Sequence, residues 1–169
     1  MITRDIEQLG ELLGEFKFCQ MVTLDGLGEM TSRPMTLQEP RSDAPLWFVA
    51  TKNSVPGINL MVNPQVNLSF HRDSDHAWIS ITGRARINDS KRLINDLWKE
   101  SWSIFLGDHD KNDIILVEVD PTKVTFWEPD KGRFGQFVSI LKAHFTDSTV
   151  EHVPTKSCTV SKTELASVM

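Results

Sequence analysis

Apolar and polar positions follow two different periods along the chain. In residues 5–17, apolar side chains recur at three- and four-residue steps, which predicts an amphipathic helix; they are Ile6, Leu9, Leu12, Leu13 and Phe16. The runs that follow are short and rich in β-branched and aromatic residues, which is typical of strands. We expect these strands at residues 18–24, 29–38, 46–51, 65–72, 76–87, 114–119 and 124–127.

Turn residues separate several of these strands. Asp25-Gly26-Leu27-Gly28 predicts a hairpin between the first two strands, and Asp120-Pro121-Thr122-Lys123 predicts a turn between the last two. Pro34 lies inside the second strand. Because proline cannot donate a hydrogen bond to a neighbouring strand, we expect this strand at a sheet edge or at a bulge.

Cap residues and a returning helical period predict three further helices. Asn53-Ser54-Val55-Pro56 predicts a helix start, and that helix should end at Asn63-Pro64. Residues 88–90 predict the cap of a helix that runs to about Trp98. A C-terminal amphipathic helix is predicted over residues 134–145, on Phe134, Phe137, Val138, Leu141 and Phe145.

The sum of these elements predicts a mainly β protein with flanking helices. Six or seven short strands interrupted by a few helices favour a small β-barrel over a parallel sheet of βαβ units. We expect one domain over residues 1–146, including the N- and C-terminal helices. Residues 147–169 are polar and lack a period, so we expect a loosely held tail there.

Composition narrows the class of partner. The chain has 169 residues and a formal net charge of −5, and its basic residues are scattered, so neither nucleic acid nor an anionic membrane surface is an expected partner. No apolar stretch approaches the roughly 18 residues of a spanning helix, and the N-terminus lacks an apolar signal core. We therefore expect a cytoplasmic protein.

Familiar metal and nucleophile patterns are missing from the sequence. The two cysteines, Cys19 and Cys158, form no CxxC pair, and Cys19 lies in an apolar run typical of a reduced core residue. The five histidines do not have metal-binding spacing, and there is no GxSxG or glycine-rich phosphate loop. We expect no metal, and no catalytic acid, base or nucleophile stands out.

One candidate binding segment is Thr31-Ser32-Arg33-Pro34-Met35 in the second strand. Proline frees the neighbouring backbone from regular pairing, so its polar groups could meet a flat polar ligand. Arg33 could reach a phosphate or a ring carbonyl with its fork of donors. An edge strand that carries one solvated arginine explains the same residues.

The other candidate segment is Thr51-Lys52-Asn53-Ser54, between a buried strand and a helix N-terminus. Free N–H groups and the positive end of a helix dipole favour an anion such as phosphate. An ordinary N-cap explains the same composition. The chain also has five tryptophans and no tyrosine; most should be core residues, and one or two could border a flat ring.

In order, these segments resemble one known family. The pieces run from the first helix to about Trp127, and the helix at 134–145 has a counterpart there. They are Ser32-Arg33-Pro34-Met35, Leu46-Trp47-Phe48-Val49, Asn63-Pro64-Gln65-Val66-Asn67, Ser80-Ile81-Thr82-Gly83-Arg84-Ala85, Val119-Asp120-Pro121 and Phe126-Trp127. The sequence resembles the general stress protein branch of the pyridoxamine 5′-phosphate oxidase-like proteins, which have the FMN-binding split-barrel fold.

The resemblance implies a homodimer with FMN in a cleft between the subunits. It places Arg33, Pro34 and Met35 along the isoalloxazine. It assigns the ribityl chain and the phosphate to the next strand end and turn, at Ala50, Thr51, Lys52 and Ser54. Pro56 stands where the family usually carries a lysine, and the ammonium of Lys52 could serve the same phosphate.

Several functions remain open within this fold. A flavin-dependent oxidoreductase is the first, and the resemblance implies a link to stress. The others are a flavin-binding or sensing module without turnover, a split barrel that uses haem or a deazaflavin, and a barrel with an empty site. Oxidation of vitamin B6 is not expected, because the segment Ser161-Lys162-Thr163-Glu164-Leu165 is not the basic, substrate-gripping C-terminus of the true oxidase.

Overall fold

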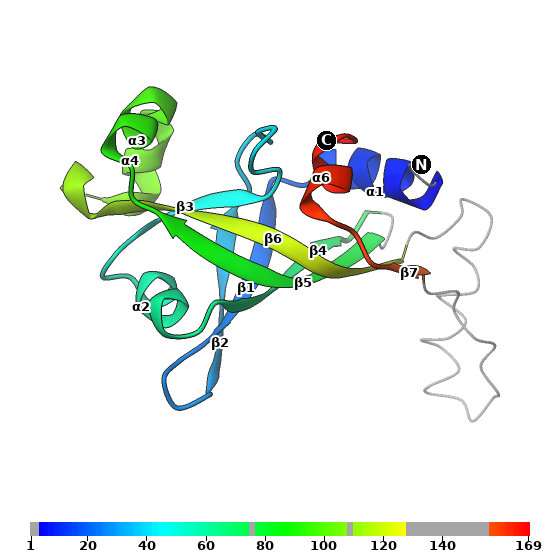
Figure 1. Cartoon of the computed structure of the whole chain (residues 1–169), viewed down its shortest axis with the longest axis horizontal. Helices are drawn as coiled ribbons and strands as arrows, with labels where there is room; N and C mark the ends of the chain where they lie inside the picture. Colours follow the sequence, from blue (N-terminus) through cyan, green and yellow to red (C-terminus); the bar gives the residue numbers. More distant parts are fainter. Residues whose placement is uncertain (1–3, 75–76, 108–109, 128–155) are drawn as a thin grey trace.

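Seven strands within the described residues, 4–74, 77–107, 110–127 and 156–169, form one antiparallel sheet in the computed structural model (Figure 1). Their order is β2-β1-β4-β5-β6-β3, with β7 paired to β6. The sheet curls so that its two ends meet, and the backbone N–H of Gln38 donates to the carbonyl of Trp47 at 3.1 Å. The expected split β-barrel with flanking helices is confirmed. The strands are β1 (Phe18–Leu24), β2 (Met30–Thr36), β3 (Trp47–Thr51), β4 (Gln65–Arg72), β5 (Ala77–Asn88), β6 (Ile114–Trp127) and β7 (Lys156–Cys158).

The barrel interior holds the larger of two apolar clusters. Alternate residues of β4 and β5 are buried, as the period of two in their sequences requires. Helix α1 (Arg4–Gly14) contributes Leu9 and Leu13, which are fully buried in this cluster. Full burial of an aliphatic or aromatic side chain stabilises the fold by about 1.5–3 kcal/mol. The strand members with the least exposure include Met21, Phe48, Leu68, Phe70, Ile81, Val117 and Phe126.

The smaller cluster lies under two short helices at one end of the molecule. Helix α3 (Lys91–Leu97) begins at Ser90, whose hydroxyl caps the backbone N–H of Leu93, as expected from the sequence. Helix α4 (Ser101–Leu106) follows it directly and was not expected. Figure 1 shows both helices against the end of the sheet where β3 and β6 pair. The buried residues of the cluster are Ala44, Trp47, Ile94, Trp102, Ile114 and Leu116.

The turn expected at residues 120–123 is wrong. Strand β6 is one continuous strand, and the pairing register with β5 shifts where Gly83 faces Pro121 and Thr82 faces Lys123. Thr122 is the extra residue of this bulge, and its hydroxyl donates to the carbonyl of Thr82 at 3.0 Å. A Cβ on Gly83 would lie 2.6 Å from the carbonyl oxygen of Asp120, so the bulge needs glycine there.

The C-terminal residues differ from the loosely held tail expected after residue 147. Residues 156–158 form β7, and helix α6 (Lys162–Ala166) packs beside α1 (Figure 1). Val160 and Leu165 are buried in the main cluster. The predicted helix at 134–145 lies outside the described residues.

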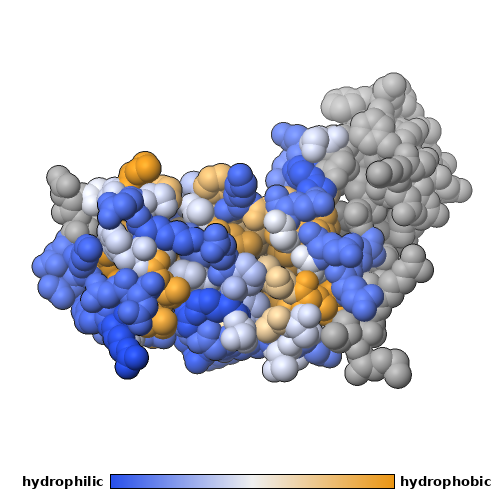
Figure 2. Space-filling view, turned by 90° about the horizontal axis from the view of Figure 1, so that it is seen from above, coloured by the Kyte–Doolittle hydropathy of each residue, from blue (hydrophilic) through white to orange (hydrophobic). Residues whose placement is uncertain are grey.

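The face shown in Figure 2 is mainly hydrophilic where the structure is described. Figure 2 shows hydrophobic side chains in separate patches on one face. None of the helices in the described ranges is long and apolar enough to cross a membrane.

Candidate functional site

An open hollow of about 280 Å³ lies between β2 and β3, at the two ends of the curled sheet. Helix α2 (Val55–Val62) and α4 add to its walls. The site therefore joins residues from four elements, which belong to three separate segments of the sequence. The lining residues are Arg33, Pro34, Met35, Thr36, Gln38, Val49, Ala50, Thr51, Ser54, Pro56, Phe105 and Leu106.

Both segments selected from the sequence meet in this hollow. Its lining contains every predicted site residue except one: Arg33, Pro34, Met35, Ala50, Thr51 and Ser54 are present and Lys52 is not. Lys52 instead forms an ion pair with Asp89, with Nζ 3.4 Å from Oδ2. Lys52 is partly exposed and Asp89 is exposed, so this pair contributes little stability.

Arg33 points to the barrel side of β2. It lies directly opposite Met21 of β1, whose side chain is fully buried, and directly opposed residues share a face. Its Nη2 donates to Thr31 Oγ1 at 2.7 Å, while its Nε is buried with no hydrogen-bond partner among the described residues. Burial lowers the pKa of Arg33 from its ordinary value, although a guanidinium stays charged. A buried, unpaired, charged donor at a hollow is available to an acceptor on a ligand.

Asn59 of α2 positions this arginine, and sequence reasoning missed it. Its side chain is buried, and Nδ2 donates to Thr23 Oγ1 at 3.0 Å and to Thr31 Oγ1 at 3.2 Å. Thr31 Oγ1 in turn accepts from Arg33. Helix α2 is thereby connected to β2 through a hydrogen-bond chain that ends on the guanidinium.

The turn from β3 into α2 forms a tight N-cap. Ser54 Oγ donates to the carbonyl of Thr51 at 2.6 Å and accepts from the N–H of Gly57 at 3.3 Å. Pro56 has no N–H, and a Cβ on Gly57 would lie 2.3 Å from the carbonyl oxygen of Thr51. The N-cap that the sequence left open is therefore present. Because the capping bond occupies the N–H of Gly57, fewer donors remain for a phosphate at this end.

Helix α4 supplies apolar lining that no local sequence pattern indicated. Trp102 is buried, and its Nε1 donates to Oε1 of Gln38 at 3.0 Å. Its ring makes edge contacts with Trp47 and Trp98, with centroids 6.1 and 5.6 Å apart. Among the described residues, the aromatic side chain in the hollow is Phe105 and not a tryptophan.

The hollow contains one charged side chain, Arg33, within the described part of the chain. No described carboxylate, histidine or cysteine lines it, and its hydroxyls belong to Thr36, Thr51 and Ser54. Cys19 faces Met35 across β1 and β2, but burial raises the pKa of its thiol to about 12. In the ranges that the structure describes, no group of His, Cys, Asp and Glu could hold a metal ion.

The comparison with protein families identifies the chain. The family model described as pyridoxamine 5′-phosphate oxidase like matches residues 4–151. The chain belongs to this family. The resemblance of the sequence to the pyridoxamine 5′-phosphate oxidase-like proteins is therefore confirmed. A comparison with curated proteins gives no match.

Solved structures share the fold of this pyridoxamine 5′-phosphate oxidase-like chain at low identity. A Clostridium acetobutylicum protein related to general stress protein 26 is 13% identical, with a TM-score of 0.66 over 92% of this chain and 94% of that one. A haem binding protein from Mycobacterium smegmatis is 12% identical, with a TM-score of 0.62 over 99% and 62%. A pyridoxamine 5′-phosphate oxidase-related, FMN binding protein from Nostoc punctiforme is 10% identical, with a TM-score of 0.54 over 93% of each chain.

Proposed function

We propose that the chain binds FMN in the hollow between β2 and β3. Arg33, Pro34 and Met35 would hold the isoalloxazine, and Ala50, Thr51 and Ser54 the ribityl chain and phosphate. Lys52 would have to leave Asp89 to reach the phosphate. The observation that carries the proposal is the buried Nε of Arg33, an unpaired charged donor beside an open hollow. Such a donor fits a carbonyl or phosphate oxygen, and FMN has both.

A homodimer belongs to the same proposal. A hollow of about 280 Å³ is slightly smaller than ligand pockets of about 300–1,000 Å³, so a second copy would complete it. Next to the hollow, α2 exposes large apolar side chains at Val55, Ile58, Met61 and Val62. A second chain would cover such a face. Light scattering at micromolar concentration should give a dimer, and a monomer would contradict this part.

FMN, when bound, would supply the redox chemistry. The described residues of the hollow would bind and orient it, since they include no carboxylate, histidine or cysteine for proton transfer. A flavin-dependent oxidoreductase is the first form of the proposal and a flavin-binding module without turnover the second. Reduction of bound FMN by NADH or NADPH distinguishes them.

Haem is the second candidate ligand, because a haem binding protein shares the fold. Haem iron usually takes a histidine, cysteine, methionine or tyrosine ligand. The described lining offers only Met35 among these types, so it favours a flavin. The absorption spectrum of freshly purified protein separates haem from flavin or deazaflavin.

The direct test is an FMN titration of the wild type, Arg33→Ala, Arg33→Lys and Arg84→Ala. The wild type should quench flavin fluorescence with about one FMN per chain. Loss of a hydrogen bond to a charged group costs about 1.5–3 kcal/mol, so Arg33→Ala should bind about 10- to 150-fold more weakly. Arg33→Lys should recover part of this loss.

Arg84 is the matched control, because it is exposed on β5 and is not part of the hollow. Its substitution should leave the affinity for FMN unchanged. No quenching by wild-type protein at high micromolar concentration would refute the proposed function. Equal affinity of wild type and Arg33→Ala would remove Arg33 from the site.

A further inference from the structure

Helix α4 places an aromatic side chain at the rim of the hollow. Phe105 lines the hollow together with Leu106, yet 56% of Phe105 is exposed. The remaining walls carry the guanidinium of Arg33 and the hydroxyls of Thr36, Thr51 and Ser54, beside the apolar residues Pro34, Met35, Val49, Ala50 and Pro56. The described residues therefore cover only part of the Phe105 ring, and the rest of the ring is available for an apolar contact with a ligand.

The position of Phe105 is fixed from within the fold. Trp102 lies one helical turn earlier, and residues at three- and four-residue steps share a helix face. Trp102 is 1% exposed and is hydrogen-bonded to Gln38, which itself lines the hollow. The helix ends directly after Leu106 at Gly107, whose φ is 64° and whose N–H donates to the carbonyl of Ser103 at 3.0 Å.

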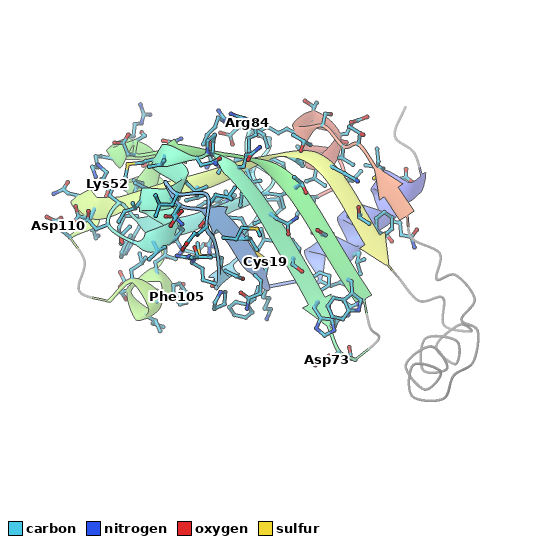
Figure 3. All side chains as sticks on the ribbon, turned by 90° about the horizontal axis from the view of Figure 1, so that it is seen from below. Cys19, Lys52, Asp73, Arg84, Phe105 and Asp110 are labelled. Atoms are coloured by element: carbon cyan, nitrogen blue, oxygen red, sulfur yellow. The ribbon has the colours of Figure 1, made fainter. Side chains whose placement is uncertain are left out.

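The opposite face of α4 provides a contrast. Ile104 is the neighbour of Phe105 in the sequence, is 80% exposed and does not line the hollow. Both side chains are large, apolar and exposed. Of these two residues, Phe105 lies on the same helix face as Trp102, and this face is turned to the hollow. Figure 3 labels Phe105 on α4.

We propose that Phe105 is a ligand-binding residue of the hollow, and that its ring packs on the flat ring system of the bound flavin. This inference rests on the proposed function. An aromatic side chain contributes to the binding of flat ring ligands through stacking or edge contact. In this proposal Phe105 contacts the ring system, which FMN and riboflavin share, and the turn at Ser54 contacts the phosphate.

The test is a titration of FMN and of riboflavin, which lacks the phosphate, into wild type, Phe105→Ala and Ile104→Ala. Phe105→Ala should weaken both flavins by roughly tenfold and to the same extent, because both carry the same ring. Ile104→Ala should bind both like the wild type. Phe105→Trp should restore the affinity by keeping an aromatic face, and Phe105→Leu should not. Because Phe105 is more than half exposed, its loss should leave the fold intact, which far-UV circular dichroism checks.

The outcomes separate this inference from the proposed function. If the wild type binds neither flavin, both fail. If the wild type binds and Phe105→Ala binds equally well, only the role of Phe105 fails. A loss confined to FMN would also overturn the inference, because it would place the effect at the phosphate.

Discussion

Gly10 provides a sharp test of how the C-terminal helix is held. It lies buried in the middle of α1, and a Cβ there would lie 2.4 Å from the carbonyl oxygen and 2.6 Å from Cγ2 of Val168, just after α6. Gly14, at the end of the same helix, is exposed and has nothing within 4 Å of such a Cβ. The two Gly→Ala substitutions therefore differ in the overlap with Val168.

The magnitude follows from the competing terms. Alanine favours a helix interior over glycine by about 1 kcal/mol. Overpacking costs about 1–3 kcal/mol, whereas release of α6 would expose Leu165 and Val160 at about 1.5–3 kcal/mol each. Overpacking costs less than release, so the chain should keep α6 packed and shift it slightly away from α1. Gly10→Ala should therefore be about 1–3 kcal/mol less stable than Gly14→Ala.

Urea denaturation of the wild type and the two variants measures this difference, provided that the m values agree. Hydrogen exchange gives the location: amides of α6 should exchange faster in Gly10→Ala and unchanged in Gly14→Ala. If Gly10→Ala proves at least as stable as Gly14→Ala, the close packing of α6 on α1 is refuted.

Two further predictions concern buried ionisable groups. Burial raises the pKa of the Cys19 thiol from its ordinary value of 9.0 to about 12, so between these values the unfolded chain binds fewer protons than the folded one. Stability should therefore fall as pH rises above about 9, by up to about 1.4 kcal/mol per pH unit, and Cys19→Ala should lack this part of the slope in urea denaturation from about pH 8 to 10.5. Glu118, which is 5% exposed, has Arg41 at 3.3 Å and Arg86 at 3.4 Å, so Glu118→Gln should lower the free energy of unfolding by about 3 kcal/mol. Arg86 is half exposed, so Arg86→Gln should cost under about 1 kcal/mol, and equal effects of the two variants would argue against a buried Glu118.

The segments that form β1 to β6 could be predicted because they are short runs rich in β-branched and aromatic residues, whereas β7 was not predicted. In β4 and β5, buried and exposed residues alternate, and the sequence shows the same alternation. The continuous course of β6 could not be predicted from Asp120-Pro121 alone, since this pair is typical of turns. The bulge is indicated only when Gly83 on the partner strand β5 is considered as well, because glycine within a strand often marks a bulge.

The ordered C-terminal residues were also within reach of the sequence. Ser161 and Glu164 form a capping box, in which each side chain satisfies a backbone N–H of the other residue. This pattern stands in the sequence just before Leu165. The residues around the capping box are mostly polar, so no helical period was visible. Helix α6 buries one of its residues, Leu165.

The sequence could predict the candidate site only where its residues are close together in the chain. Arg33, Pro34 and Met35 are neighbours in β2, and Ala50, Thr51 and Ser54 lie within five residues at the end of β3 and the cap of α2, so short motifs suggested both. Gln38, Asn59 and Phe105 reach the site through tertiary contacts. No local pattern relates α4 to the segment that follows β2, because the hydrogen bond from Trp102 to Gln38 spans 64 positions.

The hollow lies on the seam where the two ends of the sheet meet, near the hydrogen bond from Gln38 to Trp47. A ligand seated there contacts β2 and β3 at once and so acts as a non-covalent cross-link between the edges of the barrel. Occupancy and folding are then coupled by mass action: at a free ligand concentration of 100 Kd the folded state gains about 2.7 kcal/mol. The midpoint temperature of thermal unfolding should therefore rise with the concentration of free ligand, even for a ligand that undergoes no reaction.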